Sequence, residues 1–311
     1  MKLLTYIHSG QARLGALLDG RVIDLTAAYA TFWATTKPKS AVPFPADMVG
    51  FLQGGDRLLE AARAALDWAK TAPEAATREF THRLDEVRIG PPVGNPSKIM
   101  CIGLNYHDHC REQNVPVPSS PIVFVKFPSA LTAPDEPITW PPDVSKQVDY
   151  EAELAVVFKR AARNVAPEDA YDTVAGYTIL NDVSARDVQF GDKQWVRGKS
   201  FDTFCPCGPY LVTADEVGDP QQLAIQCRVN GEVRQDSNTN EMIFKIPELI
   251  AFISKTCTIL PGDILSTGTP DGVGVFRKPP VFLKAGDVVE VEIEKLGTLR
   301  NPVVAYAEGE R

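Results

Sequence analysis

Two glutamates separated by a single residue, Glu151 and Glu153, stand in a stretch that otherwise has the composition of a β-strand. Side chains at positions i and i+2 of a strand project from the same face, so these carboxylates are predicted to lie side by side. Two anions this close repel each other unless one is protonated or a cation lies between them. A third carboxylate, Asp182, ends another predicted strand, residues 176–182. Three clustered oxygen ligands suit a hard divalent ion such as Mg²⁺ or Mn²⁺, although acids on the water-facing side of a strand are the commoner origin of a lone Glu-x-Glu.

His109 and Glu112 follow a predicted strand at residues 98–102 and form a second candidate pair. If the chain enters a helical turn there, positions i and i+3 lie on the same face. A glutamate beside a histidine can orient the ring and raise its basicity, which gives a general base able to activate water. The alternative for any isolated His-x-x-Glu pattern is a surface turn with a fortuitous ion pair.

Arg186 and Gln189 lie just beyond Asp182, where the chain is predicted to turn into a helix. A guanidinium one turn from the candidate metal ligand could hold a substrate carboxylate through two parallel hydrogen bonds. Gln189 follows at i+3 from Arg186. The alternative is that Arg186 simply pairs with Asp182 or with its neighbour Asp187.

Two glycine-containing loops contribute the remaining candidates. Lys199 follows Gly198 in a predicted loop and could act as an electrophile, acid or base towards an enolate oxygen, while a solvated surface lysine is the usual alternative. A second loop, residues 268–275, follows a predicted strand at residues 263–267. It lacks the lysine of a phosphate-binding loop, which argues against nucleotide binding. Its backbone N–H groups and Thr269 could instead hold a carboxylate.

The elements that must position these residues divide at a passage rich in proline and glycine, residues 90–96. Residues 1–92 are predicted to form a small α+β domain of short strands and a helix over residues 57–70, capped by Asp56. The apolar face of that helix comprises Leu58, Leu59, Ala62, Ala65, Leu66 and Ala69. Residues 93–311 are predicted to form a larger, mostly β domain, because many short apolar runs are separated by turns, with one helix within residues 241–255.

Composition excludes several classes of protein. The chain has 311 residues, of which 44% are hydrophobic and 23% charged, as in ordinary globular proteins. No segment approaches the roughly 18 uninterrupted apolar residues of a membrane span, and the N-terminal residues resemble neither a signal nor a transit peptide, so a cytoplasmic location is expected. The net charge of −8 argues against a nucleic-acid partner. Six scattered cysteines favour free thiols over disulfides.

Taken together, the motifs resemble the fumarylacetoacetate hydrolase superfamily from about residue 97 to the C-terminus. The signatures stand in the order of that family, and five ordered motifs are far more specific than any one of them. They are Gly103-Leu104-Asn105-Tyr106 with His109 and Glu112, Glu151-x-Glu153, residues 181–187, Gly198-Lys199-Ser200-Phe201-Asp202 and Gly268-Thr269-Pro270. Residues 114–118, 203–206 and 274–280 look like the subgroup of fumarylacetoacetate hydrolase domain-containing protein 2 and its bacterial relatives.

The resemblance implies an α+β, mostly β fold, a mixed β-roll with a small N-terminal α+β domain, in a homodimer. It implies one Mg²⁺ or Mn²⁺ per chain, held by Glu151, Glu153 and Asp182. His109 and Glu112 would activate water, and Lys199 would stabilise developing charge. The substrate-binding residues would be Arg186, Gln189, Tyr106 and Thr269. The sequence departs from the founding hydrolase of the family in two ways. That hydrolase has a fourth acid ligand shortly before its histidine, and residues 101–104 here contain no acid. Its histidine also takes a glutamate partner from a remote loop, unlike Glu112.

The function implied is that of an enzyme acting on a small anionic 2-oxo acid through a metal-bound enolate. The leading expectation is oxaloacetate enol–keto tautomerisation. Hydrolysis of a C–C bond in acylpyruvates or fumarylpyruvate, and decarboxylation of oxaloacetate, are the alternatives. A non-enzymatic alternative is a β-rich binding protein with a structural cation, but such a site has no use for Lys199, His109 and Arg186 around the ion.

Overall fold

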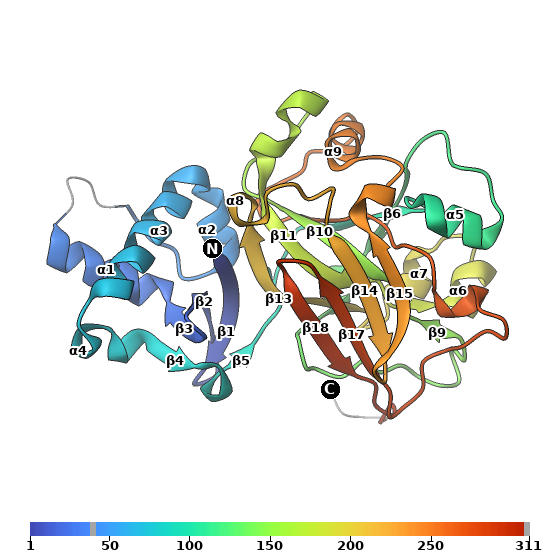
Figure 1. Cartoon of the computed structure of the whole chain (residues 1–311), viewed down its shortest axis with the longest axis horizontal. Coiled ribbons are helices and arrows are strands. Elements are labelled where there is room, and N and C mark those ends of the chain that lie inside the picture. The colour runs from blue at the N-terminus through green and yellow to red at the C-terminus, as the bar shows by residue number, and fades with distance from the viewer. Residues whose placement is uncertain (38–41, 308–311) are drawn as a thin grey trace.

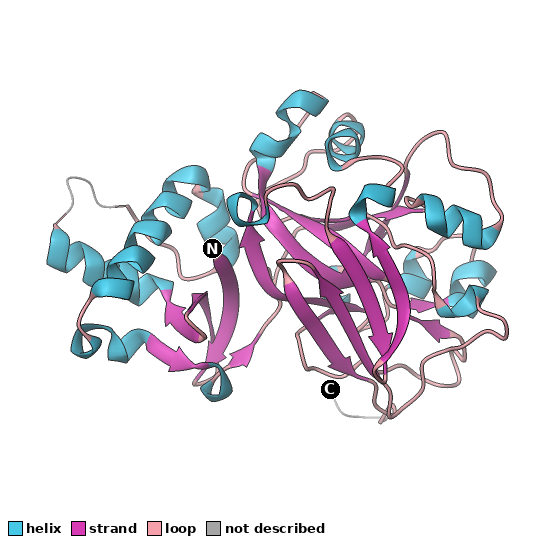
Figure 2. Ribbon diagram, in the orientation of Figure 1, coloured by secondary structure: helices cyan, strands magenta, loops and turns pink. Residues whose placement is uncertain are grey.

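In the computed structural model, which describes residues 1–37 and 42–307, a twelve-stranded mixed sheet runs through the whole molecule (Figures 1 and 2). Most neighbouring strands are antiparallel, whereas β16 pairs with β6, and β8 with β13, in parallel. The strands follow the order β4 (Thr81–Arg83), β3 (Arg21–Asp24), β2 (Gln11–Leu18), β1 (Lys2–His8), β13 (Cys205–Thr213), β11 (Val174–Asn181), β10 (Ala152–Phe158), β16 (Ile264–Ser266), β6 (Ile99–Gly103) and β7 (Ile122–Lys126), with β5 (Arg88–Ile89) beside β1 and β8 (Leu131–Thr132) beside β13.

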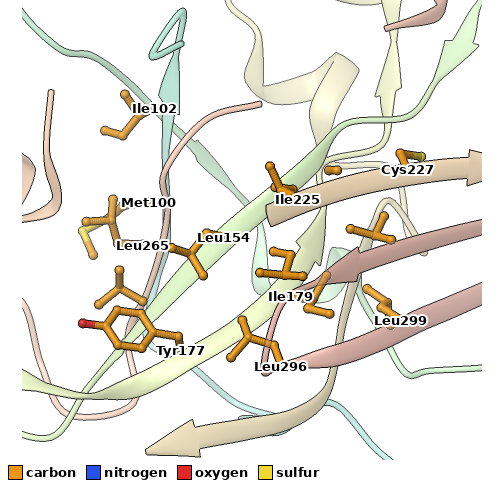
Figure 3. Close-up of a cluster of buried hydrophobic side chains, with 14 of the residues drawn as sticks. Met100, Ile102, Leu154, Tyr177, Ile179, Ile225, Cys227, Leu265, Leu296 and Leu299 are labelled. Carbon is orange, nitrogen blue, oxygen red and sulfur yellow. The ribbon is translucent and has the colours of Figure 1, made fainter. Parts of the chain in front are cut away.

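A smaller antiparallel sheet lies against the large one and closes the main core. Its strands follow the order β15 (Glu232–Asn238), β14 (Ala224–Val229), β17 (Val288–Ile293) and β18 (Gly297–Pro302). Leu154 on β10 and Ile179 on β11 pack there against Ile225 of β14 and Leu299 of β18 (Figure 3). The α+β, mostly β architecture predicted from the sequence is confirmed.

Strand β10 is buried on both of its faces, and its side chains alternate between two cores. Leu154 and Val156 point into the core between the two sheets, whereas Ala155 and Val157 join a second cluster with the N-terminal helices. The alternation places Glu153 on the same side as Ala155 and Val157, at the beginning of the strand.

The N-terminal part carries α1 (Leu25–Thr36), α2 (Met48–Gln53), α3 (Gly55–Thr71) and α4 (Glu74–Thr77). The sequence does not predict α1 or α2. It does predict α3, whose face of Leu58, Ala62, Ala65 and Leu66 is buried, but the expected cap is wrong. The residue that precedes α3 is Gly54, and Asp56 lies inside the first turn, where its carboxylate pairs with Lys159 at 2.5 Å.

The N-terminal part and the larger part share a sheet and a core. Strand β1 pairs with β13, which brings Lys2 opposite Val212, and the second hydrophobic cluster combines Phe51 and Phe80 with Ala155. The N-terminal elements occupy the left of Figure 1 and meet the larger part along this strand pair. Strands from both sides of residues 92 and 93 therefore belong to one continuous sheet, and the domain boundary at that position stays a prediction.

The remaining helices are short and lie in the larger part: α5 (His107–Gln113), α6 (Arg186–Gly191), α7 (Val196–Lys199), α8 (Ala214–Val217) and α9 (Ile246–Ser254), with a small ladder of β9 (Val148–Asp149) and β12 (Ser184–Ala185). The helix expected within residues 241–255 is α9.

No helix within the described ranges has the length and apolarity to cross a membrane. All six cysteines are free thiols, as predicted.

Asn105 connects the turn before α5, through hydrogen bonds, to the residues that follow β16 and to those that precede α9. Its side-chain amide donates to the carbonyls of Thr267 at 2.8 Å and Phe244 at 3.1 Å, and its Oδ1 accepts from the Phe244 N–H at 2.8 Å. Because the residue is fully buried, Asn105→Ala should lower the free energy of unfolding by about 1–3 kcal/mol. Urea denaturation of this variant and of Asn95→Ala, an exposed control, checks the value; equal losses would contradict it.

Candidate active site

The structure brings together the three carboxylates that the sequence predicts. Glu151 immediately precedes β10, Glu153 lies on it, and Asp182 directly follows β11; the antiparallel register of Ala152 with Asn181 places them side by side. One oxygen of each carboxylate lies within 4.8 Å of the others, and all three side chains are buried. The cluster thus needs positive charge close by.

Buried cations surround two of these three carboxylates. The Lys199 ammonium donates to Glu151 at 2.7 Å and to Asp182 at 2.8 Å, and Lys126 donates to the other oxygen of Asp182 at 2.5 Å. Arg186 Nη1 lies 2.7 Å from Glu151 Oε1. Burial alone would raise the pKa of Glu151, but Lys199 and Arg186 outweigh it and lower that pKa to about 2. Glu151 is therefore ionised.

Glu153 is the carboxylate without a cationic partner. Its Oε2 accepts hydrogen bonds from the Ser266 hydroxyl at 2.5 Å and from the Gly268 N–H at 3.0 Å, but no lysine or arginine in the described residues forms an ion pair with it. Burial, followed by the charges of Asp182 and Glu151, raises the pKa of Glu153 well above its ordinary value. A divalent cation among three carboxylates would supply the missing charge, and hard oxygen donors fit such an ion.

Arg186 is held from behind and keeps one donor free. It begins α6, its Nε donates to Asp149 Oδ2 at 2.9 Å, and its Nη1 donates to Gln189 Oε1 at 3.1 Å. The predicted alternative of an ion pair with Asp182 or Asp187 is wrong, because Arg186 pairs with Asp149 and Glu151. Its Nη2 is buried and has no hydrogen-bond partner. A buried donor in this state is suited to an anionic ligand.

Lys199 ends a short helix, α7, and not a loop as the sequence suggests. A side chain at Gly198 would collide with the backbone of Gln189 and Ala185, so glycine lets α7 approach α6 closely. This approach inserts Lys199 among the carboxylates. Its ammonium also lies 5.2 Å from the centre of the Phe124 ring.

His109 and Glu112 form the expected pair on α5. His109 Nδ1 lies 3.1 Å from Glu112 Oε2, and the Gly272 N–H donates to the other carboxylate oxygen at 2.9 Å. Gln113, which the sequence reading did not single out, lies 2.8 Å from His109 Nε2 through its own Nε2. Both ring nitrogens of His109 are therefore engaged. Phe276 packs edge-on against the ring at 6.0 Å.

These groups meet at a cavity that holds about 490 Å³ of free space, including its open mouth. The polar part of its wall is formed by His109, Gln113, Glu151, Glu153, Arg186, Gln189, Lys199 and Thr269, and the apolar part includes Ile102, Leu104, Phe124, Phe190, Trp195 and Phe276. The contributing helices α5, α6 and α7 gather at the right of Figure 1. An apolar wall with a few convergent charged groups is typical of a small-molecule site.

Two predicted substrate-binding residues are placed differently from the others. Tyr106 is fully buried in the main core and does not line the cavity, so the structure offers it no contact with a ligand there. Thr269 lines the cavity, but its hydroxyl donates to the Ala152 carbonyl at 3.0 Å and accepts from Gln235 at 2.8 Å. The loop that carries Thr269 does bind a carboxylate through a backbone N–H, and that carboxylate is Glu153.

Sequence reasoning missed Lys126 and Asp149, which hold the charged side chains in place. Lys126 ends the apolar strand β7, and a lone lysine at the end of such a strand was the available signal. Asp149 is fully buried and accepts from Arg186 and from the N–H groups of Gly274 and Val275 at 2.7 and 3.0 Å. It therefore ties the arginine to the loop that precedes Phe276.

Comparison with known proteins identifies the family. Residues 98–304, two thirds of the chain, match the family described as fumarylacetoacetate (FAA) hydrolase C-terminal. This chain belongs to the fumarylacetoacetate hydrolase family. The match covers each of the clustered carboxylates and the whole cavity wall.

Several members of the fumarylacetoacetate hydrolase family are similar over most of their length. The mitochondrial oxaloacetate tautomerase fahd2 of Xenopus laevis is 53% identical over 95% of this chain and 87% of its own. The oxaloacetate tautomerase YisK of Bacillus subtilis is 43% identical over 83% of this chain and 87% of its own. The maleylpyruvate hydrolase of Sphingobium sp. SYK-6, solved with manganese(II) and pyruvate, is 31% identical, with a TM-score of 0.76 over 99% of this chain and 100% of that one. The predicted family and subgroup are thus confirmed.

Proposed function

We propose that this enzyme interconverts the enol and keto forms of oxaloacetate. The observation that carries the proposal is the cavity wall on which Arg186, with a free buried donor, and Lys199 lie beside the carboxylate cluster. This wall suits a small dianionic 2-oxo acid, because a carboxylate can pair with the guanidinium while an ammonium lies near. Relatives 43–53% identical are named oxaloacetate tautomerases, which supports this substrate.

We propose Glu151, Glu153 and Asp182 as the ligands of one Mg²⁺ or Mn²⁺ per chain. Three carboxylates match the preference of either ion for hard oxygen donors. The bound ion would act as a Lewis acid that stabilises negative charge on the substrate oxygens. The burial of Glu153 beside Glu151 and Asp182, with no ion-pair partner among the described residues, supports the assignment.

The chain's own residues have distinct tasks in this reaction. Arg186, which lines the cavity, binds a substrate carboxylate through Nη2, the buried donor without a partner, and Gln189 accepts from Nη1 and holds the guanidinium in place. Lys199 Nζ donates a hydrogen bond to the enolate oxygen, where charge develops as the proton leaves carbon. Burial would lower the pKa of Lys199, but Asp182 and Glu151 raise it, so Lys199 acts as a cationic donor and not as a base.

Hydrolysis of a C–C bond is the second candidate, and the His109–Glu112 pair favours it. A histidine oriented by a glutamate on the cavity wall is the arrangement that activates water. The likeness to a maleylpyruvate hydrolase gives the same candidate further support. We place it second because Gln113 already engages the nitrogen of His109 that a water would need.

A direct comparison of substrates tests this order. With Mg²⁺, the enzyme should accelerate the decay of enol-oxaloacetate, followed by its ultraviolet absorbance, and cleave acetylpyruvate far more slowly. Release of CO₂ from oxaloacetate, measured in parallel, reports the decarboxylase alternative. Rapid cleavage of acetylpyruvate without tautomerase activity would reverse our order, and no turnover of either compound would favour the binding-protein alternative.

We also propose that the chain forms a homodimer. Strand β7 is an edge of the large sheet, and it and the residue after it expose apolar side chains at Ile122, Val123 and Phe127. An exposed apolar edge strand is a surface that proteins usually cover. Light scattering of the purified protein tests the stoichiometry. The cytoplasmic location expected from the sequence stays a prediction.

A further inference from the structure

Gln113 is the only residue besides Glu112 whose side chain hydrogen-bonds the His109 ring within the described part of the chain. It ends α5 four residues after His109, so the two side chains lie on one face of the helix. Its amide nitrogen lies 2.8 Å from His109 Nε2. With an N–H donating to Nε2, the neutral ring must carry its proton on Nδ1, which donates to Glu112 at 3.1 Å.

We infer that Gln113 is a positioning residue that selects the reaction: it engages the lone pair of His109 that would otherwise take a proton from water. This inference rests on the proposed function and deepens it. His109 and Gln113 both line the cavity, so a water attacking a bound substrate from this wall would need the nitrogen that the amide occupies. Gln113 thus suppresses hydrolysis and leaves the Arg186 and Lys199 wall unaffected.

The reaction that Gln113 suppresses is cleavage of an acylpyruvate. His109 Nε2 would take a proton from water while the water oxygen bonds to the acyl carbonyl carbon. The bond between that carbon and the pyruvate methylene then breaks, and its electron pair stays on the pyruvate fragment. The proton passes from His109 to that carbon, so acetylpyruvate and water yield pyruvate and acetic acid, which ionises to acetate and releases the second proton of the water. Tautomerisation forms and breaks no carbon–carbon bond and needs no such water.

Gln113→Met is the test, because methionine keeps the length of the side chain and removes its polar group. The ratio of acetylpyruvate cleavage to enol-oxaloacetate tautomerisation should rise at least about tenfold, since a positioned general base contributes about 10²–10⁴-fold. The matched control is Arg111→Met on the same helix, where the exposed arginine pairs with Glu241 away from the cavity. This control should leave the ratio unchanged.

The tautomer of His109 can be measured directly, and it should not change if Gln113 had only a structural role. The chain has four histidines, so ¹⁵N-labelled imidazoles can be resolved, and His109→Gln assigns the signal. The wild type should show a protonated Nδ1 and a hydrogen-bonded Nε2, and Gln113→Met should shift Nε2 alone. Gln113→Ala replaces it if the methionine variant fails to fold.

An unchanged cleavage ratio, or an unchanged Nε2 signal, in a folded variant overturns the inference. The inference is also overturned if the wild type cleaves acetylpyruvate as fast as Gln113→Met. Failure of the proposed function is separately visible. A wild type without tautomerase activity disproves that function, whereas Gln113→Met can still shift the Nε2 signal and cleave acetylpyruvate faster than the wild type.

Discussion

Lys199→Met should lower the rate of enol–keto conversion by about 10²–10³-fold, the loss typical of removing one donor to a developing oxyanion. Lys199 is buried, lines the cavity and lies between Glu151 and Asp182 at 2.7 and 2.8 Å. Methionine fills a similar volume but cannot donate a hydrogen bond or carry charge. The rate constant kcat should therefore fall more than KM rises, because Arg186 remains to bind the substrate.

Steady-state assays of this variant beside Lys193→Met measure the effect. Lys193 is exposed six residues earlier, so its loss reports the general cost of removing a positive charge from this segment. Binding of Mn²⁺ to Lys199→Met, followed by calorimetry, shows whether the carboxylate cluster is intact. A folded variant that binds the ion and turns over within about twofold of the wild type would rule out this role for Lys199.

Removal of the divalent ion with EDTA should abolish turnover, and Glu153→Gln should weaken Mn²⁺ binding by at least about 100-fold. Loss of a residue that merely supports a ligand typically costs 10–100-fold in affinity, so loss of a ligand should cost more. Glu153 is the sharpest choice among the three carboxylates. Its neighbours donate only a hydroxyl and a backbone N–H, and glutamine can still accept from both.

Titration of Mn²⁺ into the chelator-treated protein, followed by the electron paramagnetic resonance of the free ion, measures this affinity independently of activity. The control is Glu232→Gln, an exposed carboxylate on β15. Equal affinity in Glu153→Gln and the control would exclude Glu153 as a ligand. If EDTA unfolds the chain while Lys199→Ala leaves turnover unchanged, the ion is structural and the proposed chemistry is wrong.

The carboxylate cluster could be predicted because strand geometry encodes it. Glu151 and Glu153 are two residues apart at the start of β10, and the pairing of β10 with β11 is enough to bring Asp182 beside them. The spacing of His109 and Glu112 on one helical turn was equally legible. Such features depend on the period of a single element or on one strand pair.

The partners that fix the charges around this cluster were harder to predict from the sequence. Lys126 reaches Asp182 from a strand 56 residues earlier, and Asp149 reaches Arg186 across 37 residues. No local period connects such pairs, because tertiary packing alone decides which charges meet. Sequence reasoning therefore found the acids and the candidate catalytic groups, but not the partners that fix their charge states.

The misplaced cap of α3 has a related physical cause. Gly55 adopts a φ of +56°, which lets the chain turn directly from α2 into α3 and leaves no capping role for Asp56. The Asp56 side chain instead meets Lys159 and Arg160, which lie more than a hundred residues away. In contrast, Asp24, the last residue of β3, does cap α1, since its Oδ1 accepts from the Ala27 N–H at 2.9 Å.

The pairing of β1 with β13 also limits how the protein can be shortened. Although the family match begins at residue 98, a fragment cut there would leave Leu211 and Val212 of β13 without their partner strand and would open this buried part of the sheet to water. Bare strands of this kind recruit other chains and aggregate. For protein engineering, the first eight residues therefore belong to the catalytic unit, and a tag or fusion partner is better attached beyond the C-terminal strand.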